Sequence, residues 1–224
     1  MSFEQLGLLP SLLKSVAEQG FTEPSDIQQQ AIPLILEGQD IMASAPTGTG
    51  KTAAFVLPAL QNLSKSTPQP GTGPRVLVLT PTRELATQVS DNIYKLTKYL
   101  RMRSTTIVGG MPYPPQIKAL RQSVDFLVAT PGRLIDHMEA GRIDFSRIEM
   151  LILDEADRML DMGFVDEVMR IAKKMPATKQ TLLFSATLEG QIEKVARALL
   201  KSPARLQIAG VKVKHDNYTA YFTR

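Results

Sequence analysis

The feature that most constrains this chain is the alternation of short apolar runs with helical patterns along its length. Several runs are apolar on both faces, which is typical of strands buried in a parallel sheet. Right-handed crossovers between such strands place helices on both faces. We therefore predict an α/β fold, a mostly parallel sheet with helices on both faces. The predicted strands cover residues 40–44, 75–80, 105–108, 126–130, 150–154, 181–185 and 205–208.

Between these runs, apolar residues recur at helical spacing and form stripes that could pack on a sheet. Near the start of the chain, such a stripe is expected to end at Gly20. Segments 64–74 and 111–115 are rich in turn-forming residues and are predicted to be loops. The three stripes consist of Leu9, Leu12, Leu13, Val16 and Ala17; of Leu85, Val89, Ile93, Leu96 and Leu100; and of Ile192, Val195, Ala196 and Leu199.

Composition excludes several classes of protein. The 224 residues are 43% hydrophobic, enough for a substantial core, and include no cysteine, so disulfides and Cys-based zinc sites are excluded. No run has the apolar length of a membrane span, and the first residues lack the pattern of a secretory signal. We expect a cytoplasmic protein without a membrane partner.

Charge gives weaker information about partners. The net charge of +4 permits a polyanionic partner without requiring one. Lys95, Lys98, Arg101 and Arg103 form a local basic group. On charge alone, a solvated helix face is the preferred interpretation of this group.

A glycine-rich loop follows the first predicted strand and precedes an apolar helical segment. Its Gly-Lys-Thr ending matches a P-loop, although Ala45 stands where the strict pattern has glycine. Glycines let backbone N–H groups surround a phosphate, Lys51 supplies a cation for the β- and γ-phosphates, and the Thr52 hydroxyl can ligate Mg²⁺. An ordinary glycine-rich turn, the alternative, does not account for this ending. The candidate nucleotide-binding residues are Ala45, Pro46, Thr47, Gly48, Thr49, Gly50, Lys51 and Thr52.

An acidic sequence ends the predicted strand over residues 150–154. Asp154 at a strand end can hold Mg²⁺, directly or through water, and Glu155 can orient or deprotonate an attacking water. An acidic first helical turn, favoured by the helix dipole, is the alternative. The P-loop on another strand favours the nucleotide interpretation. On the nucleotide interpretation, the catalytic residues are Lys51, Asp154 and Glu155. The metal ligands are Thr52 and Asp154, and Mg²⁺ is a cofactor.

The sequence Asp-Glu-Ala-Asp and the motifs around it resemble the DEAD-box RNA helicases over nearly the whole chain. Segment 20–28 is similar to the family's Q motif, which implies that Gln28 hydrogen-bonds the adenine edge and that Phe21 packs near the base. Phe3 resembles the isolated aromatic residue upstream of that motif. Ser25 and Gln28 also have the spacing of a capping box, and both roles are compatible. The implied nucleotide is ATP.

The resemblance also implies a surface that contacts the RNA backbone. Arginines can pair with phosphates and glycines allow close approach, so binding is expected to be independent of sequence. For Thr130, which precedes a proline, the alternative is a helix N-cap followed by a first-turn proline. The residues that match motifs Ia, GG and Ib are Pro81, Arg83, Gly109, Gly110, Thr130 and Arg133.

Ser185 and Thr187 match motif III, which in the family links the nucleotide site to RNA engagement. The link runs through the last aspartate of the box, here Asp157. The alternative is that both hydroxyls cap the next helix. The sequence around this motif and the P-loop also resembles bacterial members that act in ribosome assembly.

The resemblance divides the chain into two parts. Residues 1–210 are expected to form the first RecA-like P-loop NTPase domain, with an ATP-binding core over about 36–208. Residues 211–224 are expected to be a linker toward a second RecA-like domain. In the family that second domain carries arginine fingers, which contribute roughly 10³–10⁵ to the rate of phosphoryl transfer. Nothing like its motifs occurs before Arg224.

The expected function is that of the ATP-binding half of an ATP-dependent RNA helicase, a hydrolase that acts as a monomer on RNA. Two other functions stay open. One is a P-loop ATPase that acts on DNA or protein, which the RNA motifs disfavour. The other is a nucleotide-gated RNA-binding module with little activity as an isolated domain, which the intact catalytic residues disfavour.

Overall fold

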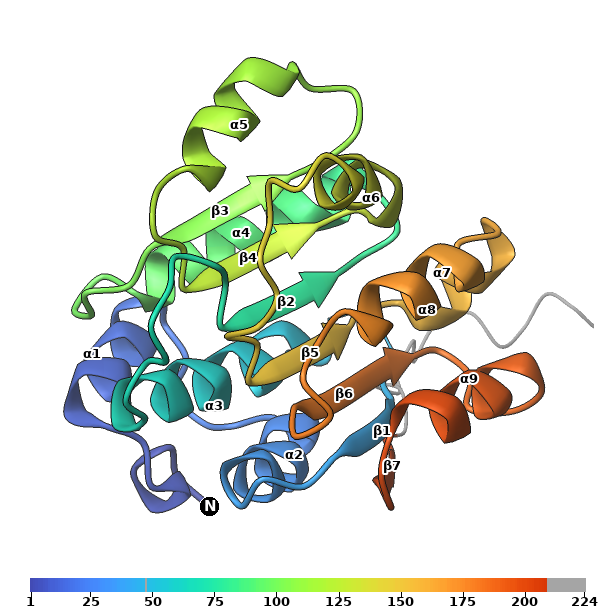
Figure 1. The fold of residues 1–224 in the computed structure, drawn as a ribbon. Helices are drawn as coiled ribbons and strands as arrows, with labels where there is room; N and C mark the ends of the chain where they lie inside the picture. The colour runs from blue at the N-terminus through green and yellow to red at the C-terminus, as the bar shows by residue number, and fades with distance from the viewer. Residues whose placement is uncertain (47, 209–224) are drawn as a thin grey trace, which may run out of the picture.

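A 7-stranded sheet runs through the computed structural model, which describes residues 1–46 and 48–208 (Figure 1). Each predicted strand is confirmed, with both ends within one residue of the predicted ones. The predicted linker over 211–224 and the site residue Thr47 lie outside the described residues. The strands are β1 (Ile41–Ser44), β2 (Val76–Leu79), β3 (Ser104–Ile107), β4 (Phe126–Ala129), β5 (Met150–Leu153), β6 (Gln180–Ser185) and β7 (Ala204–Gln207).

All neighbouring strands are parallel, in the order β3-β4-β2-β5-β6-β1-β7. Their carboxyl ends therefore lie at one edge of the sheet, which is where ligands bind in open α/β sheets. The order places β5, β6 and β1 side by side. It places β3, β4 and β2 side by side as a second group. Residues that follow the strands of one group are consequently neighbours at this edge.

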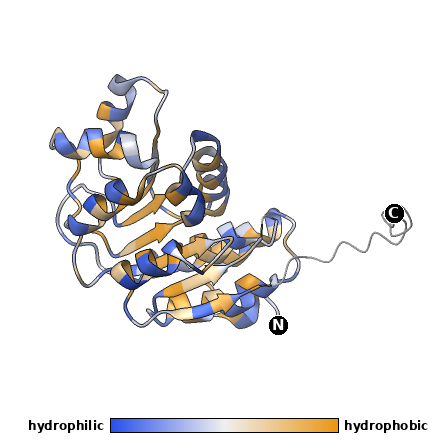
Figure 2. Ribbon diagram, turned by 90° about the vertical axis from the view of Figure 1, so that its right-hand side faces the viewer, coloured by the Kyte–Doolittle hydropathy of each residue, from blue (hydrophilic) through white to orange (hydrophobic). Residues whose placement is uncertain are grey.

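Helices cover both faces of the sheet, as predicted. Alternate residues of each strand point to opposite faces, so that Val76 and Val78 belong to one core cluster and Leu77 to the other. Figure 2 shows mostly hydrophobic strands between helices of mixed character. The first cluster is covered by α1 (Pro10–Glu18), α2 (Asp26–Leu36), α3 (Lys51–Lys65) and α4 (Arg83–Leu96), and the second by α6 (Pro131–Glu139), α7 (Ala156–Asp161), α8 (Val165–Lys173) and α9 (Gln191–Leu199).

Some element ends differ from the predictions. The helix α5 begins at Tyr113 and runs to Leu120, so the predicted loop over 111–115 is wrong from Tyr113 onward. Its prolines lie in the first helical turn, where a missing N–H costs no hydrogen bond. The predicted loop over 64–74 begins after Lys65, where α3 ends. The helix α4 ends at Leu96, and Leu100 packs against the core beyond it.

Gly20 ends the first long helix, as predicted. Its φ of 79° is left-handed, and its N–H donates to the carbonyl oxygen of Ala17. The N–H of Phe21 donates to the carbonyl oxygen of Val16. These two hydrogen bonds satisfy carbonyl groups in the last turn of α1, and the left-handed glycine turns the chain toward the Q motif. A short 3-10 helix, Glu4–Leu6, precedes α1.

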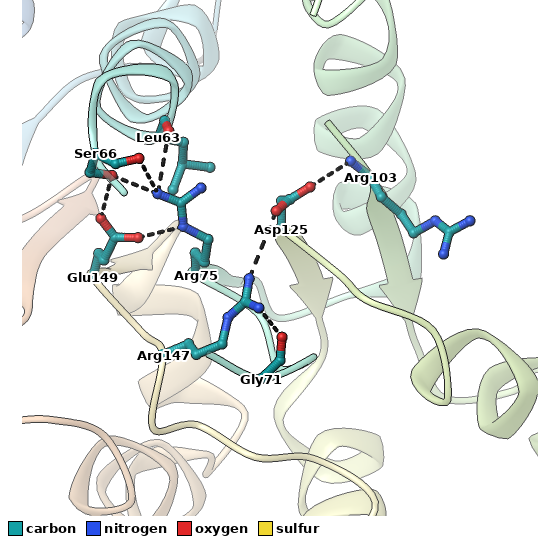
Figure 3. A network of polar contacts seen from close by, with 8 residues as sticks. All are labelled: Leu63, Ser66, Gly71, Arg75, Arg103, Asp125, Arg147 and Glu149. Atoms are coloured by element: carbon teal, nitrogen blue, oxygen red, sulfur yellow. Dashed lines mark hydrogen bonds and ion pairs between the residues drawn. The ribbon is translucent and has the colours of Figure 1, made fainter. Parts of the chain in front are cut away.

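Buried arginines fasten the loop after α3 to the amino ends of the strands (Figure 3). The Nε atom of Arg75 donates to Oε2 of Glu149 at 2.6 Å, and Ser66 Oγ donates to Oε1 of the same carboxylate at 2.8 Å. Arg147 donates to the carbonyl oxygen of Gly71 and lies 3.9 Å from an oxygen of Asp125. Each buried guanidinium has an anionic partner, which offsets part of the cost of burying its charge. Among the described residues, no helix combines the length and apolarity needed to cross a membrane.

Candidate active site

The P-loop follows β1, the acidic sequence follows β5, and β6 lies between these two strands. Lys51, the first residue of α3, extends its ammonium group toward the acidic residues. Its Nζ atom is 3.0 Å from Oδ1 of Asp154 and 3.5 Å from Oε1 of Glu155. The sheet order therefore brings together the three residues predicted to be catalytic, although Lys51 is about 100 positions away from the two acidic residues in the sequence.

The P-loop requires glycine at two positions. Gly48 and Gly50 both have a φ of 81°, a left-handed conformation that favours glycine. A Cβ atom at Gly50 would also lie 2.5 Å from Nε2 of Gln28. Thr49 Oγ1 donates to the carbonyl oxygen of Pro46 at 2.7 Å and closes the turn. The buried Ala45, in place of the strict pattern's glycine, donates its N–H to the carbonyl oxygen of Ser185 at 3.4 Å.

Gln28 connects the Q motif to this loop. Its side chain is 2% exposed; its Oε1 accepts the Ser25 N–H at 3.0 Å and its Nε2 donates to the carbonyl oxygen of Gly50 at 3.1 Å. The capping box of Ser25 and Gln28 is confirmed. The amide still has one donor hydrogen and one acceptor lone pair to offer a ligand.

Two hollows flank the loop and share Phe21, Gly48 and Gly50. One, of about 370 Å³, is lined by Gln28, and the other, of about 260 Å³, is lined by the catalytic and metal-binding candidates Lys51, Thr52, Asp154 and Glu155. Phe21 is 38% exposed and lines both hollows, so its ring is accessible to a ligand there. Phe3 lines neither hollow, because it is buried in the first core cluster.

Asp154 is almost fully buried, and burial raises its pKa above the usual range, while the nearby Lys51 ammonium opposes this shift. The charged carboxylate thus depends on a cation close by. Asp154 and the Thr52 hydroxyl line the same hollow, so they fit a Mg²⁺ ion held by few protein oxygens together with phosphates and water. Within the described residues, no cluster of three or more His, Cys, Asp or Glu could hold a metal without such help.

Glu155 has an unusual backbone for a residue with a side chain. Its φ of 53° and ψ of 51° are left-handed, which costs about 1–2 kcal/mol for a non-glycine residue. Its carboxylate lies between Lys51 and Arg158, the latter at 3.7 Å. Strain of this kind occurs at functional sites, where the surrounding structure imposes it.

Motif III lies beside the P-loop, but its hydroxyls do not cap a helix. Ser185 is buried at the end of β6, and its Oγ accepts the Thr187 N–H at 3.4 Å. The next helix, α9, has Gly190 as its N-cap, so the capping alternative is wrong. No hydrogen bond joins Asp157 to either hydroxyl in the part of the chain that the structure describes.

The sequence-based prediction missed a residue that connects motif III to the P-loop strand. Ser44 is the last residue of β1, and its Oγ donates to the carbonyl oxygen of Ala186 at 3.1 Å. The signal available in the sequence was that Ser44 is a polar residue at the end of an otherwise apolar strand. This hydrogen bond ties the carboxyl ends of β1 and β6 together.

The candidate RNA residues follow the other group of strands. Pro81 and Arg83 follow β2, the glycine pair follows β3, and Thr130 follows β4. The Gly109 N–H donates to Oγ1 of Thr130 at 3.2 Å, so the GG and Ib motifs are in contact. Thr130 is the N-cap residue of α6, as the alternative predicts, but its hydroxyl binds Gly109 and makes no capping bond.

Arg83 is exposed and lies close to the glycine pair. It is the first residue of α4, and a Cβ atom added to Gly110 would lie 3.6 Å from its Nη1 atom. Gly110 also has a left-handed φ of 77°. The structure therefore brings together the exposed guanidinium of motif Ia and the GG turn.

Arg133 is held by three contacts. Its Nη1 atom donates to the carbonyl oxygen of Met111 at 2.5 Å and to Oε1 of Gln116 at 3.2 Å, and its guanidinium lies 3.9 Å from the Tyr113 ring centre. An arginine has five N–H donors, so those on Nε and Nη2 remain for a phosphate. The ring contact fixes the orientation of the guanidinium plane.

Gln116 and His137 form a buried connection that no sequence motif indicated. Gln116 donates to the carbonyl oxygen of Val108 at 2.9 Å, and its Oε1 lies 2.8 Å from Nε2 of His137. His137 is fully buried; burial and the charges of Arg142 and Arg133 lower its pKa. The neutral imidazole thus joins α6 to α5 and to the strand end before the GG turn.

Comparisons with known proteins agree with this geometry. The family model described as DEAD/DEAH box helicase matches residues 25–195. The DEAD-box ATP-dependent RNA helicase RhpA of Helicobacter pylori is 44% identical over 221 residues, which cover 99% of this chain and 44% of RhpA. The ATP-dependent RNA helicase SrmB of Escherichia coli is 48% identical over 206 residues, 92% of this chain and 46% of SrmB. The chain thus spans less than half the length of these relatives.

The fold has close structural relatives. The crystal structure of a DEAD box protein from Methanococcus jannaschii superimposes with a TM-score of 0.86 at 38% identity, over 93% of this chain and 56% of that one. A structure of a hypothetical ATP-dependent RNA helicase from Sulfolobus tokodaii matches with a TM-score of 0.80, also at 38% identity, over 88% of this chain and 56% of that one. The predicted fold class, a RecA-like P-loop NTPase domain, is confirmed.

Proposed function

Because the chain belongs to the DEAD/DEAH box helicase family, we propose that it is the ATP-binding half of an ATP-dependent RNA helicase. The observation that carries the proposal is the 3.0 Å contact between Lys51 and Asp154, which follow β1 and β5, the strands on either side of β6. The relatives named above are ATP-dependent RNA helicases, which supports the same activity here. The reaction would be hydrolysis of ATP, with Mg²⁺, coupled to local separation of an RNA duplex.

In the proposed site each hollow takes one end of the nucleotide. Gln28 offers its remaining donor and acceptor to adenine, and Phe21 packs on the base. The loop from Ala45 to Thr52 supplies N–H groups for the phosphates, and the Lys51 ammonium neutralises their charge. Thr52 and Asp154 would hold Mg²⁺, which stabilises the charge that develops on the phosphates.

Glu155 is the proposed residue that orients and deprotonates the attacking water. A catalytic carboxylate must be fixed in position relative to the water it activates. The strained backbone of Glu155 and its contacts with Lys51 and Arg158 fix this carboxylate. We propose that Asp157, Ser185 and Thr187 couple this site to RNA.

The proposed RNA surface uses the neighbouring group of strands. Arg83 and the free donors of Arg133 would bind phosphates, and Gly109 and Gly110 would allow the RNA backbone to approach. Pro81 and Thr130 would shape the same surface. The Gly109 to Thr130 hydrogen bond supports a single surface that includes both motifs. Since these contacts reach the backbone only, binding would be independent of RNA sequence.

Stimulation of the ATPase by nucleic acid tests the proposal. The full-length protein is expected to hydrolyse ATP faster with single-stranded RNA than with DNA of the same sequence, and Lys51→Ala is expected to lose this activity. Equal stimulation by DNA would favour a P-loop ATPase of another class. RNA binding that depends on ATP, but without turnover, would favour the nucleotide-gated binding module.

We also propose, from the sequence resemblance alone, finer features of the protein. These are a second RecA-like domain in the full-length protein, a monomeric state, a cytoplasmic location and a role in ribosome assembly. Co-sedimentation of the tagged protein with precursor ribosomal particles tests the last of these. Distribution only in the protein-free fractions of the gradient would contradict it.

A further inference from the structure

A hollow at the amino-terminal edge of the sheet belongs to neither the proposed ATP site nor the proposed RNA surface. It has a volume of about 890 Å³ and is formed by the end of α1, the last turn of α4 and the segment that leads into β3. Ser104, the first residue of β3, lines it. Because all strands are parallel, this edge is opposite the one that carries the P-loop and the RNA motifs (Figure 1).

The hollow carries unpaired positive charge. Lys95, Lys98 and Arg103 line it and are exposed. Of the described residues that line it, one carries a carboxylate, Glu18, whose Oε2 lies 3.1 Å from the Lys98 ammonium. Among the residues that the structure describes, Lys95 and the Arg103 guanidinium have no ion pair or side-chain hydrogen bond. Figure 3 shows the Arg103 side chain extending away from Asp125, which binds only its backbone N–H.

An aromatic side chain stands beside these cations. Tyr94 lines the hollow and is 79% exposed, more than any other large hydrophobic residue that the structure describes. Exposure of a ring to this extent leaves its face free for a ligand. Tyr99 differs, because its hydroxyl binds Glu18 and the Lys14 ammonium lies 4.3 Å from its ring centre.

We propose that this hollow is a second RNA-binding surface that takes single-stranded RNA. A base would stack on Tyr94, and the phosphates beside it would pair with Lys95 and Arg103. The alternation of a free ring with free cations matches the alternation of base and phosphate in a nucleic acid strand, whereas an acidic peptide would use the cations only. The inference rests on the proposed function, which makes RNA the polyanion of this protein.

The helix α4 connects the two surfaces. Arg83 is its first residue, and Tyr94 and Lys95 lie in its last turn. A helix of 14 residues is about 20 Å long, so a few extended nucleotides would bridge the two ends. An RNA strand that leaves the Arg83 end can therefore continue into the hollow. The second surface would lengthen the RNA footprint without adding preference for sequence.

RNA length separates the two surfaces experimentally. The full-length protein, with a non-hydrolysable ATP analogue, is titrated against labelled single-stranded RNAs of about 5 and about 16 nucleotides, close to the range of site sizes known for single OB folds. The combined variant Tyr94→Ser, Lys95→Gln and Arg103→Gln is expected to bind the long RNA about tenfold more weakly, the scale of one lost stacking contact. Its affinity for the short RNA is expected to match the wild type. For the long RNA, the slope of log K against the logarithm of the salt concentration should become less steep by about 1.4. This change corresponds to the loss of two phosphate contacts at about 0.7 each.

A charge-matched variant controls for net charge. Lys173→Gln with Lys174→Gln removes two exposed cations near the end of α8 and is expected to bind both RNAs as the wild type does. All three side chains changed in the test variant are exposed, so its melting temperature should also match the wild type.

The outcomes distinguish the two proposals. Unchanged affinity for the long RNA, or an equal loss for both lengths, would overturn the second surface. If the three side chains govern binding of polyglutamate but not of the long RNA, the hollow takes an acidic peptide and the inference is likewise overturned. If the wild type binds neither RNA with the ATP analogue, the proposed function itself is wrong.

Discussion

At the scale of single residues, Glu155 and Asp154 are adjacent carboxylates with different surroundings. Asp154 is 3% exposed and contacts Lys51 at 3.0 Å, whereas Glu155 has a left-handed backbone and a less buried side chain. Adjacent carboxylates in different environments can take different roles, one in binding the cation and one in proton transfer.

Glu155→Gln separates these roles. In the full-length protein, the variant is expected to lower RNA-stimulated ATP hydrolysis by at least about 10²-fold, because an amide cannot accept the proton of the attacking water. ATP affinity should stay within a few-fold of the wild type, because Asp154 and Lys51 remain. Steady-state turnover and the binding of a fluorescent ATP analogue measure the two effects. The exposed Glu189→Gln serves as a control, and near wild-type turnover in Glu155→Gln would refute the role.

Gln28→Ala tests base selection. Removal of the amide is expected to reduce the preference for ATP over GTP roughly tenfold, the scale of two hydrogen bonds at about 1 kcal/mol each with some compensation by water. Gln28→Glu is the matched variant, because its carboxylate can still accept the Ser25 N–H but cannot donate to Gly50. Competition titrations with both nucleotides measure the preference. If Gln28→Ala keeps the wild-type preference, Gln28 serves only as part of the helix cap.

At the scale of elements, His137 makes the packing of α6 on α5 sensitive to pH. Burial and two nearby arginines lower its folded-state pKa, so the unfolded chain takes up the proton more readily than the native protein. The stability contributed by the neutral imidazole is present above the unfolded pKa of about 6.5 and is lost as the pH falls below that value.

The expected result is a steeper loss of unfolding free energy in the wild type than in His137→Gln between about pH 7 and pH 5, the range that begins near the unfolded pKa of histidine. Urea unfolding at several pH values measures both slopes. Because glutamine can also donate to Gln116, the variant keeps a partner for that side chain. Parallel slopes would show that protonation of His137 is not linked to unfolding.

The sequence predicted the elements better than the contacts between them. Strands such as β5 and β2 are apolar on both faces, so local pattern alone identifies them. The start of α5 was missed because prolines such as Pro114 and Pro115 are typical both of loops and of the first turn of a helix. The Gln116 and His137 connection depends on how α5 packs on α6, and no local spacing encodes that packing.

The same distinction applies to the candidate site. The motifs predicted that Lys51 and Asp154 belong to one site, because a P-loop and an acidic strand end have strong local patterns, and the structure brings the two residues into contact. The bond from Gln28 to Gly50 and the contacts that hold Arg133 come from residues distant in sequence, so they required the structure. The coupling role of Asp157 remains a prediction, since the motif alone indicates it.

At the scale of the whole molecule, the carboxyl edge of one sheet is shared between two groups of strands. The P-loop follows β1, the acidic sequence follows β5, and the motif III residues lie at and after the end of β6, whereas the RNA candidates follow β3, β4 and β2, with β2 and β5 paired at the boundary. Ligands of the two groups would therefore bind to the same sheet. The proposed second RecA-like domain, if it lies over this edge, would contact both ligands at once.

This arrangement predicts the behaviour of the 224-residue chain alone. It is expected to bind ATP, but its turnover should be lower than that of the full-length protein by roughly 10³-fold or more, because arginine fingers come from elsewhere in such enzymes. Separation of an RNA duplex should be negligible. Strand-separation and ATPase assays of both proteins check this. Robust duplex separation by the isolated chain would contradict the two-domain proposal.

The hydrogen bond from Gln28 Nε2 to the Gly50 carbonyl has a thermodynamic consequence for both ends of a nucleotide. An amide that supports the loop cannot turn to suit another purine without releasing the backbone around the phosphates. Choice of base and affinity for the triphosphate are then coupled quantities. By reciprocity, a change that loosens the loop would also make the protein less selective for adenine, even if it lies far from the base.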